Sequence, residues 1–477
     1  MKHAKTNHDN FSVLNTDAFD RRRFGEVFEI SAHLQKIRAE AALPFFEHLL
    51  ADIWASLYKM KPKMRAGEVQ LDLIVNQLLM GRIMAEEQFV NYRRFTRLDD
   101  LSSAIGTVKI GEKVNEWLAE IMLLDEELLD ELQEIQTTQS LLQKNDTPEN
   151  KLVKIEADIN NAMIDLRGKL HKTMQNNKQS FSLSIEQAVQ ETKQVTESMK
   201  SLLGGTRAGS GDAELKKIPL RDQISLAEKI ASTTHMKEIA DWAGRFKQIA
   251  RKKQKIKHSE SLEKSGVTFG HNIERLLPME LVLYTHPITR IDFLRRFVEG
   301  QTMQYEQEGK EILGKGPIVL CLDQSGSMYK LDTQAKGFTV ALMSIARKQR
   351  RDFCLIVFST RTQIFNYVKG NIKTADIFNL AQIFLGGGTD FTLPLDEAVN
   401  VINESRFKQA DVIFVTDGEN EVEESFLEVF NKKKSKKDFK VLSLVIGNET
   451  NTVMQFSDKV VRVKDLDEAG SFTAFEI

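Results

Sequence analysis

From residue 316 onward the sequence alternates short apolar runs with amphipathic stretches, and this alternation constrains the fold more than any other feature. The apolar runs read PIVLCLD, FCLIVFS, TQIFNYV, DVIFVTD, KVLSLVIG and KVVRV, and the stretches between them have helical periodicity. Continuous β-branched runs are typical of strands covered on both faces, as in a parallel sheet wrapped by helices. The sequence therefore predicts an α/β, doubly wound, mostly parallel and Rossmann-like sheet over residues 313–477.

Ahead of this domain, residues 1–203 carry apolar side chains at the three- and four-residue intervals of amphipathic helices. The near-heptad spacing predicts an all-α helical bundle region with long antiparallel helices. The glycine-rich stretch LLGGTRAGSGDAE predicts a flexible linker over residues 204–215, and residues 216–312 are expected to form a helical connector. The apolar positions that carry the longest predicted helices are Trp117, Ile121, Leu124, Leu128, Leu132 and Ile135, then Ile155, Ile159, Ala162, Leu166, Leu170 and Met174.

The bulk composition narrows the class of protein. With 477 residues the chain suggests two or three domains, and a net charge of −2 gives no global basic field that would favour nucleic acid. The start, MKHAKTNHDNFSVLN, lacks the apolar segment of a secretory signal, and no apolar run is long enough for a membrane span. Because Cys321 and Cys354 both lie in apolar runs, we expect buried free thiols and a cytoplasmic location.

Oxygen-bearing side chains follow the predicted strands at three places. Asp323, Ser325 and Ser327 follow the first strand, Thr389 follows LGGG, and Asp417 ends the run VIFVTD. Asp and Ser also cap helices routinely, so any one cluster alone has an ordinary structural explanation. Because the carboxyl ends of parallel strands share one edge, the three together favour a cation site. The all-oxygen donor set is the preference of Mg²⁺, with Mn²⁺ as the alternative.

The motifs DQSGSM, GGGTD and VTDG, in this order, resemble the von Willebrand factor A (VWA) domain and its metal-ion-dependent adhesion site. The resemblance covers about the last third of the chain. It implies that Ser325, Ser327 and Thr389 coordinate Mg²⁺ directly, while Asp323 and Asp417 act through water or from behind these ligands. It also implies that the open coordination position takes a Glu or Asp from a partner protein.

A helical region followed by such a domain resembles the bacterial ViaA-type proteins, which work with a MoxR-class AAA+ ATPase. The connector IERLLPMEL…FLRRFVEGQTMQYE is similar to the segment before the VWA domain in that family. Because Gly418 follows the last Asp here, the chain is placed in the wider MoxR-associated group. The resemblance implies a non-enzymatic, chaperone-like adaptor with an AAA+ ATPase partner. Asp390 is expected only to support the loop of Thr389.

Two other functions fit parts of the sequence. A metal-chelatase-type VWA subunit that assists metal insertion also works with an AAA+ ring. Such chains normally carry an ATPase-like domain or an acidic linker, and neither is seen in this sequence. An RNA-associated helical protein is suggested by the basic tract RFKQIARKKQKIKH and by NKKKSKKDFK. The plainer interpretation of the first tract is the solvated face of a helix. The chain lacks a Gly-Lys-Ser/Thr loop, so we do not expect it to hydrolyse ATP.

Overall fold

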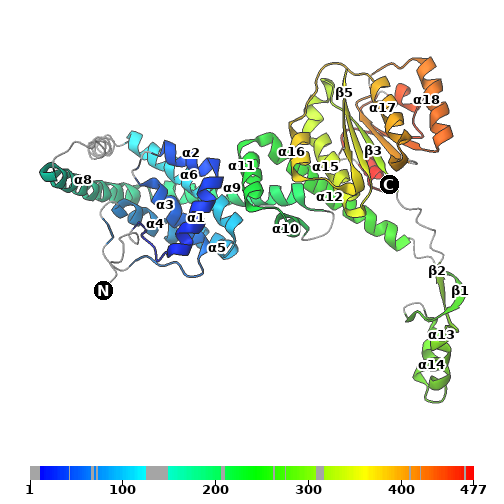
Figure 1. Ribbon diagram of the computed structural model, residues 1–477, viewed down its shortest axis with the longest axis horizontal. Helices are drawn as coiled ribbons and strands as arrows, with labels where there is room; N and C mark the ends of the chain where they lie inside the picture. Colours follow the sequence, from blue (N-terminus) through cyan, green and yellow to red (C-terminus); the bar gives the residue numbers. More distant parts are fainter. Residues whose placement is uncertain are drawn as a thin grey trace. The chain divides into compact units, whose positions relative to one another are not determined.

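The protein is described here by a computed structural model, shown in Figure 1. The structure describes residues 11–41, 43, 45–65, 69–70, 73–124, 149–205, 210–260, 264–273, 276–307, 316–407, 410–418, 420–448, 450–466 and 469–476. The chain divides into two compact units, one formed by Met1–Lys200 with Asp212–Lys237 and the other by Ser201–Gly211 with Glu238–Ile477.

The first unit is helical, as the periodicity predicts. Its helices are α1 (Ala18–Ile30), α2 (Ala32–Glu40), α3 (Phe46–Tyr58), α4 (Ile74–Ala85), α5 (Glu87–Thr96), α6 (Asp100–Leu124), α8 (Glu149–Asn176) and α11 (Leu220–Ser232). Three further helices, α9 (Lys178–Leu203), α10 (Ser210–Leu215) and α12 (Thr234–Glu260), have residues in both units. The continuation predicted through Leu128, Leu132 and Ile135 lies outside the described residues.

Helix α3 forms the centre of the first unit. It is apolar nearly all round, and Leu50, Ile53 and Trp54 are fully buried, which is the pattern of a helix enclosed by its neighbours. Helix α6 approaches it closely at Gly106, where an added Cβ would lie 2.8 Å from Leu57 Cδ1. A larger residue at this position would push the two helices apart, so the glycine sets their packing distance.

Helices α6 and α9 run antiparallel. Lys109 and Lys113 of α6 both pair with Glu191 of α9, at 3.1 and 3.7 Å, whereas Trp117, further along α6, packs edge-on against Phe181, earlier in α9. The ring centroids of that aromatic pair are 4.9 Å apart. Near-heptad spacing allows neighbouring long helices to pack in either direction, and these contacts show that the two helices pack antiparallel.

The second unit contains the predicted sheet. Its strands are β3 (Ile318–Asp323), β4 (Phe353–Phe358), β5 (Thr362–Tyr367), β6 (Asp411–Thr416), β7 (Lys440–Ile446) and β8 (Lys459–Val463). They lie in the order β5-β4-β3-β6-β7-β8, and every pairing is parallel except that of the edge strand β5 with β4. The helices between them are α15 (Asp332–Gln349), α16 (Thr374–Gln382), α17 (Thr392–Asn403), α18 (Glu424–Lys437) and α19 (Asn451–Met454). The doubly wound, mostly parallel fold is confirmed.

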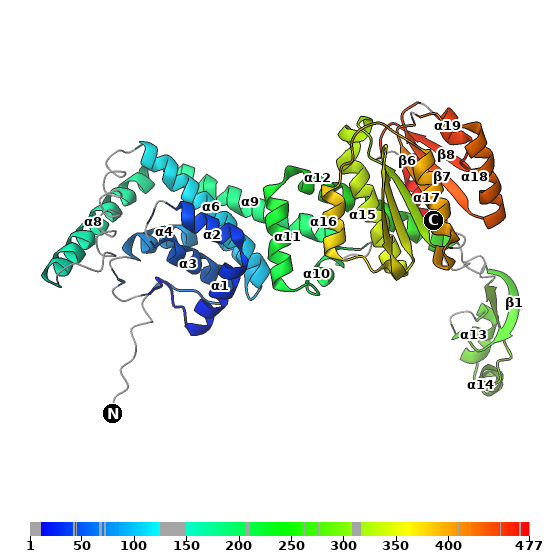
Figure 2. The same ribbon diagram turned by 45° about the horizontal axis from the view of Figure 1, so that its top comes forward.

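Helices cover both faces of this sheet (Figures 1 and 2). On one face Phe391 and Phe430, from the α17 and α18 side, join a buried cluster with Phe414 of β6. On the other face lies α15, whose Phe338 packs edge-on against Phe246 of α12 with ring centroids 5.7 Å apart. The fully buried strands β3 and β4 therefore have apolar partners on both sides, which explains their continuous apolar sequences.

Two features differ from the expected organisation. The connector, expected to be helical, holds helices α13 (Pro278–Thr285) and α14 (Arg290–Val298) but also the strands β1 (Lys264–Gly270) and β2 (Thr302–Gln307), which pair antiparallel. The cause is non-local, because β1 finds its partner only more than thirty residues later in the chain. Within the expected linker, Ser210–Leu215 forms the short helix α10. Its Asp212 pairs with Lys200 at 3.2 Å, a tertiary contact that the local amino-acid composition does not predict.

Candidate metal centre

The loop after β3 lies where the winding of the sheet changes direction. From β3 the chain proceeds to β4 on one side and later returns to β6 on the other side. The parallel registers pair Asp323 with Phe358 of β4 and Leu322 with Val415 of β6. The carboxyl ends of three neighbouring strands therefore meet at Asp323. In open α/β sheets the crevice at such a switch point is where ligands bind.

Asp323 is buried and held by two hydrogen bonds. Its side chain is 1% exposed. The Ser325 N–H donates to Oδ1 at 2.8 Å, and the Thr416 hydroxyl donates to Oδ2 at 2.6 Å. Burial raises the pKa of Asp323 to about 6, although these hydrogen bonds lower it, and the nearby charge of Asp417 raises it further. A positive charge at this edge would stabilise the ionised form of Asp323.

The two serine hydroxyls of the same loop lie side by side. Ser325 Oγ and Ser327 Oγ are 3.0 Å apart. Ser325 is buried, whereas Ser327 is exposed at the start of the 3₁₀ turn Ser327–Leu331. The pair therefore presents two oxygen donors that reach from the buried carboxylate towards solvent.

The glycine-rich loop is bound to the Asp-x-Ser-x-Ser loop through its backbone. The Gly386 N–H donates to the Gln324 carbonyl at 3.0 Å, and the Gly326 N–H donates to the Gly387 carbonyl at 2.9 Å. Gly386 and Gly387 have φ values of 63° and 83°, a left-handed conformation that favours glycine. This geometry brings the backbone of Thr389 to the same edge of the sheet.

Asp390 supports this loop, as expected. Its N–H donates to the Ser359 carbonyl at 3.0 Å, and its Oδ1 accepts the Thr392 N–H at 2.8 Å where α17 begins. Ser359 directly follows β4, and its own hydroxyl is buried without a hydrogen-bond partner among the described residues. It adds a further oxygen at this edge that the sequence motifs did not single out, although its position after a strand is the same signal.

Asp417 completes the set. Its Oδ1 is buried and has no hydrogen-bond partner in the described part of the chain. A buried carboxylate oxygen without a partner is costly, and a bound cation or cation-bound water would satisfy it. The described residues contain no cluster of three or more His, Cys, Asp or Glu side chains that could hold a metal. A cation here would therefore depend on the Ser and Thr hydroxyls, which fits the hard-cation donor set.

Two further residues of the site, Thr416 and Gln324, were missed by sequence reasoning. Thr416 orients Asp323, and its Oγ1 also accepts the Gly418 N–H at 3.1 Å. Gln324 is buried between the ligand positions, and its Nε2 donates to Asp332 Oδ1 at 2.8 Å. Neither role could be read from spacing, because each depends on which residue lies across from it in the folded sheet.

Comparisons with known proteins agree with this geometry. Residues 318–419 match the family model of the von Willebrand factor type A domain. Over 274 residues, 56% of this chain and 69% of the relative, the chain is 31% identical to the uncharacterized protein MJ0077 of Methanocaldococcus jannaschii. The chain belongs to the von Willebrand factor A domain proteins. A second M. jannaschii protein, MJ0811, is 27% identical over 463 residues, which cover 95% of this chain and 97% of that protein.

This VWA protein is also similar to ViaA. The regulatory protein ViaA of Proteus mirabilis is 29% identical over 170 residues, 32% of this chain and 35% of that ViaA. The chain thus spans about a third of the length of that relative. The ViaA-like character expected from the sequence is confirmed. Among the described residues, no helix is both long enough and apolar enough to cross a membrane.

The basic tract of this VWA protein does not form a fully solvated helix face. Lys247 of α12 is buried and donates to the carbonyl oxygens of Ser201 and Leu202 at 2.7 and 2.9 Å, at the end of α9. Phe246 beside it is fully buried. At this position the expectation of a solvated lysine was wrong, because tertiary packing uses the cation to satisfy helix carbonyls. A lysine so used is not available to a phosphate backbone.

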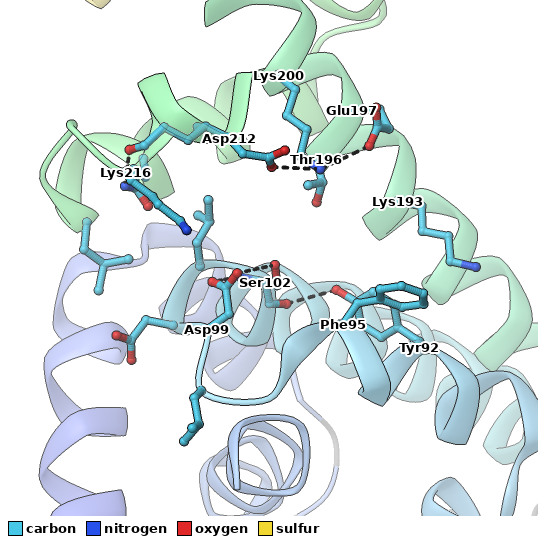
Figure 3. Close-up of a pocket in the computed structure, with 16 residues that line it drawn as sticks. Tyr92, Phe95, Asp99, Ser102, Lys193, Thr196, Glu197, Lys200, Asp212 and Lys216 are labelled. Atoms are coloured by element: carbon cyan, nitrogen blue, oxygen red, sulfur yellow. Dashed lines mark hydrogen bonds and ion pairs between the residues drawn. The ribbon is translucent and has the colours of Figure 1, made fainter. Parts of the chain in front are cut away.

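A separate cleft of about 770 Å³ lies in the first unit (Figure 3). The turn between α5 and α6, helix α9 and helix α10 line it. Its carboxylates already have partners: Asp99 accepts from the N–H and the hydroxyl of Ser102, and Glu197 and Asp212 both pair with Lys200. These carboxylates therefore do not form an open ligand set, and the sheet edge remains the candidate metal centre.

Proposed function

We propose that this VWA protein is a non-enzymatic adaptor that binds Mg²⁺ at the sheet edge and docks an acidic side chain of a partner protein there. The observation that carries the proposal is the grouping of two adjacent hydroxyls, Ser325 and Ser327, with buried Asp323 and an Asp417 oxygen that has no partner among the described residues. Thr389 would supply the third hydroxyl from the glycine-rich loop. Bound Mg²⁺ would supply a Lewis-acidic position that accepts one more oxygen ligand.

The donor chemistry explains why an acidic partner is expected. Neutral hydroxyls from Ser325, Ser327 and Thr389 on the metal leave most of its charge uncompensated. Asp323 is turned towards Thr416 and its own loop by its hydrogen bonds, which suits a carboxylate that acts through water. A cation with residual positive charge at a partly exposed edge attracts a Glu or Asp from outside.

The proposed partner is a MoxR-class AAA+ ATPase. Similarity to ViaA, a relative named as a regulatory protein, supports a regulatory partnership. The helical first unit would recruit or regulate the ATPase, while the VWA domain docks the acidic ligand. The two proteins together would form a chaperone-like complex.

The metal part is tested by titrating Mg²⁺ into the full chain in a calorimeter. The wild-type chain is expected to bind, and Asp323→Ala is expected to abolish the heat of binding. Ser344→Ala is a matched control, since that buried hydroxyl only donates within α15, to the Val340 carbonyl. Binding that is unchanged in Asp323→Ala would contradict the metal site.

The partner part is tested by a pull-down of the MoxR-class ATPase of the same organism with the immobilised full chain and nucleotide. We expect retention by the wild-type chain and by Ser344→Ala, and weaker retention by the Ser325→Ala/Ser327→Ala double variant. No retention by the wild-type chain would contradict the pairing. Equal retention by all three would mean that the ATPase binds elsewhere than at the metal site.

A further inference from the structure

A buried ion pair lies at the start of α15, next to the loops of the candidate metal centre. Lys336 Nζ is 2.6 Å from Asp332 Oδ2, one helical turn earlier in the same helix, and the two side chains are 1% and 5% exposed. Lysine is almost never fully buried without a partner. Burial lowers the pKa of Lys336, although the hydrogen bond and the charge of Asp332 raise it. Placing an ammonium group here therefore has a cost in free energy.

Stability alone does not explain such a pair. Apolar residues of similar volume usually stabilise a fold as well as a buried ion pair does, or better. Apolar residues cannot supply directed hydrogen bonds, however, and a buried charged group can. Lys336 and Asp332 each make a further hydrogen bond of this kind, and both bonds lead to the loops of the metal centre.

Asp332 binds the first of these loops. The side chain of Gln324 donates from Nε2 to Asp332 Oδ1 at 2.8 Å. Gln324 is 1% exposed and lies between Asp323 and Ser325, which both belong to the candidate site. The hydrogen bond therefore ties the Asp-x-Ser-x-Ser loop to the first turn of α15.

Lys336 fixes the start of the second loop. Its Nζ also donates to the Ala381 carbonyl at 3.1 Å. Ala381 is the next-to-last residue of α16, where helix carbonyls lack partners within the helix and a cation is favourable. The chain then leaves α16 and reaches Gly386 of the glycine-rich loop five residues after Ala381. Lys336 thus holds the point from which this loop begins.

The two loops also contact each other, so the hydrogen bonds form a closed ring. The Gly386 N–H donates to the Gln324 carbonyl at 3.0 Å. Gln324 is therefore held on two sides, by its carbonyl through Gly386 and by its side chain through Asp332 and Lys336. While the ion pair is intact, this ring keeps the two loops in one relative arrangement.

We propose that Lys336 and Asp332 are a positioning pair for the candidate metal centre. They hold the Asp-x-Ser-x-Ser loop and the glycine-rich loop in the arrangement that brings Ser325, Ser327 and Thr389 to one place before a cation binds. Preorganised ligands bind more tightly, because the cation does not have to order the loops. The effect on affinity rests on the proposed Mg²⁺ site, whereas the effect on the loops requires no metal.

Hydrogen exchange of the full chain in EDTA, followed by mass spectrometry, tests the arrangement of the loops without a metal. Lys336→Met/Asp332→Leu replaces the pair by apolar side chains of similar shape, so the domain is expected to fold. Amides that bond between the two loops, those of Gly326 and Gly386, should then exchange about tenfold faster or more, the effect of losing one hydrogen bond to a charged group. Unchanged exchange at both glycines would overturn the proposal.

A second buried ion pair serves as the matched control. Arg296 of α14 pairs with Glu280 of α13 at 2.7 Å, and Glu280 is 3% exposed. Arg296→Met/Glu280→Leu removes this pair in the same way and should leave the exchange of the loop amides at the wild-type rate. Faster exchange in this control as well would mean that any lost ion pair loosens the loops, which also contradicts the proposal.

Calorimetric titration of Mg²⁺ into the same proteins tests the consequence for the metal centre. Lys336→Met/Asp332→Leu should lose about 10–100-fold in affinity, the range for residues that orient metal ligands, and the control should keep the wild-type affinity. Gln324→Leu leaves the ion pair intact and removes only its bond to the first loop. This milder variant should also show weaker Mg²⁺ binding and faster exchange, and it carries both tests where the double variant does not fold.

The two measurements separate the positioning pair from the metal site itself. Wild-type Mg²⁺ affinity in both Lys336→Met/Asp332→Leu and Gln324→Leu would refute a role of the pair in metal binding. A wild-type chain that binds no Mg²⁺ would contradict the proposed metal site, and the exchange of the Gly326 and Gly386 amides would still decide whether the pair positions the loops.

Discussion

Replacing Thr416 by Val removes one oxygen from the candidate metal centre and keeps the shape of the side chain. The hydroxyl donates to Asp323 Oδ2 at 2.6 Å and accepts the Gly418 N–H at 3.1 Å. The first bond is short and reaches a buried carboxylate, so its loss should cost about 1.5–3 kcal/mol of folding free energy. Loss of the second bond leaves the buried Gly418 N–H without its acceptor, which adds to the cost in folding free energy.

The same substitution should weaken Mg²⁺ binding. The Thr416 hydrogen bond lowers the pKa of Asp323, which burial raises to about 6. Without it the carboxyl ionises less readily and is no longer held in its orientation. Loss of a residue that orients a metal-binding carboxylate typically reduces metal affinity about 10–100-fold. At 1.36 kcal/mol per tenfold this is about 1.4–2.7 kcal/mol, the range expected for the lost hydrogen bond.

Calorimetric titration of Mg²⁺ at pH 7.5 measures the affinity, and urea unfolding in EDTA measures the folding free energy. Thr416→Ser keeps the hydroxyl and should restore most of the affinity. Thr192→Val is the matched control, because that buried hydroxyl donates only to the Ala188 carbonyl within α9. Wild-type Mg²⁺ affinity in Thr416→Val, or an equal loss in Thr192→Val, would refute the reasoning.

Three further predictions concern stability. Burial raises the pKa of Asp52 in α3 to about 7 from its usual 3.8, so the folded protein holds a proton that the unfolded chain releases. The free energy of unfolding should therefore fall by about 1.4 kcal/mol per pH unit between pH 4 and 7. Urea unfolding should show a steeper loss with pH in the wild type than in Asp52→Asn. Gly337→Ala should destabilise, although Gly to Ala usually stabilises a helix, because a Cβ there would lie 2.9 Å from Ala243 N and closer still to Trp242; the expected cost is about 1–3 kcal/mol, and a raised urea midpoint would contradict it. Asp417→Asn should abolish the Mg²⁺ response. In EDTA it should slightly stabilise the chain, because the negative charge of Asp417 repels that of Asp323 and raises the pKa of Asp323. A thermal shift with and without Mg²⁺ separates the two effects, and a retained Mg²⁺ response would exclude Asp417 from the site.

Much of the candidate site could be predicted because its signal is local. Asp323, Ser325 and Ser327 follow a short β-branched apolar run that is typical of a buried strand, and Asp417 follows another. Parallel strands carry such residues to one edge without further information. Spacing along the chain could not show that Thr416 is bonded to Asp323, since this contact depends on the order of strands in the sheet.

The sequence by itself determined the periodicities, and with them the helical first part, the doubly wound domain and the strand ends that carry oxygen-bearing side chains. Periodicity is a local property, fixed by which side chains must face away from water. Only the tertiary structure decided that β1 pairs with the distant β2 and that Lys247 is buried and donates to the carbonyls at the end of α9. It also decided that an apolar face of α14 is exposed. Each of these depends on a partner supplied by another part of the fold, and no local pattern along one segment specifies which partner that is.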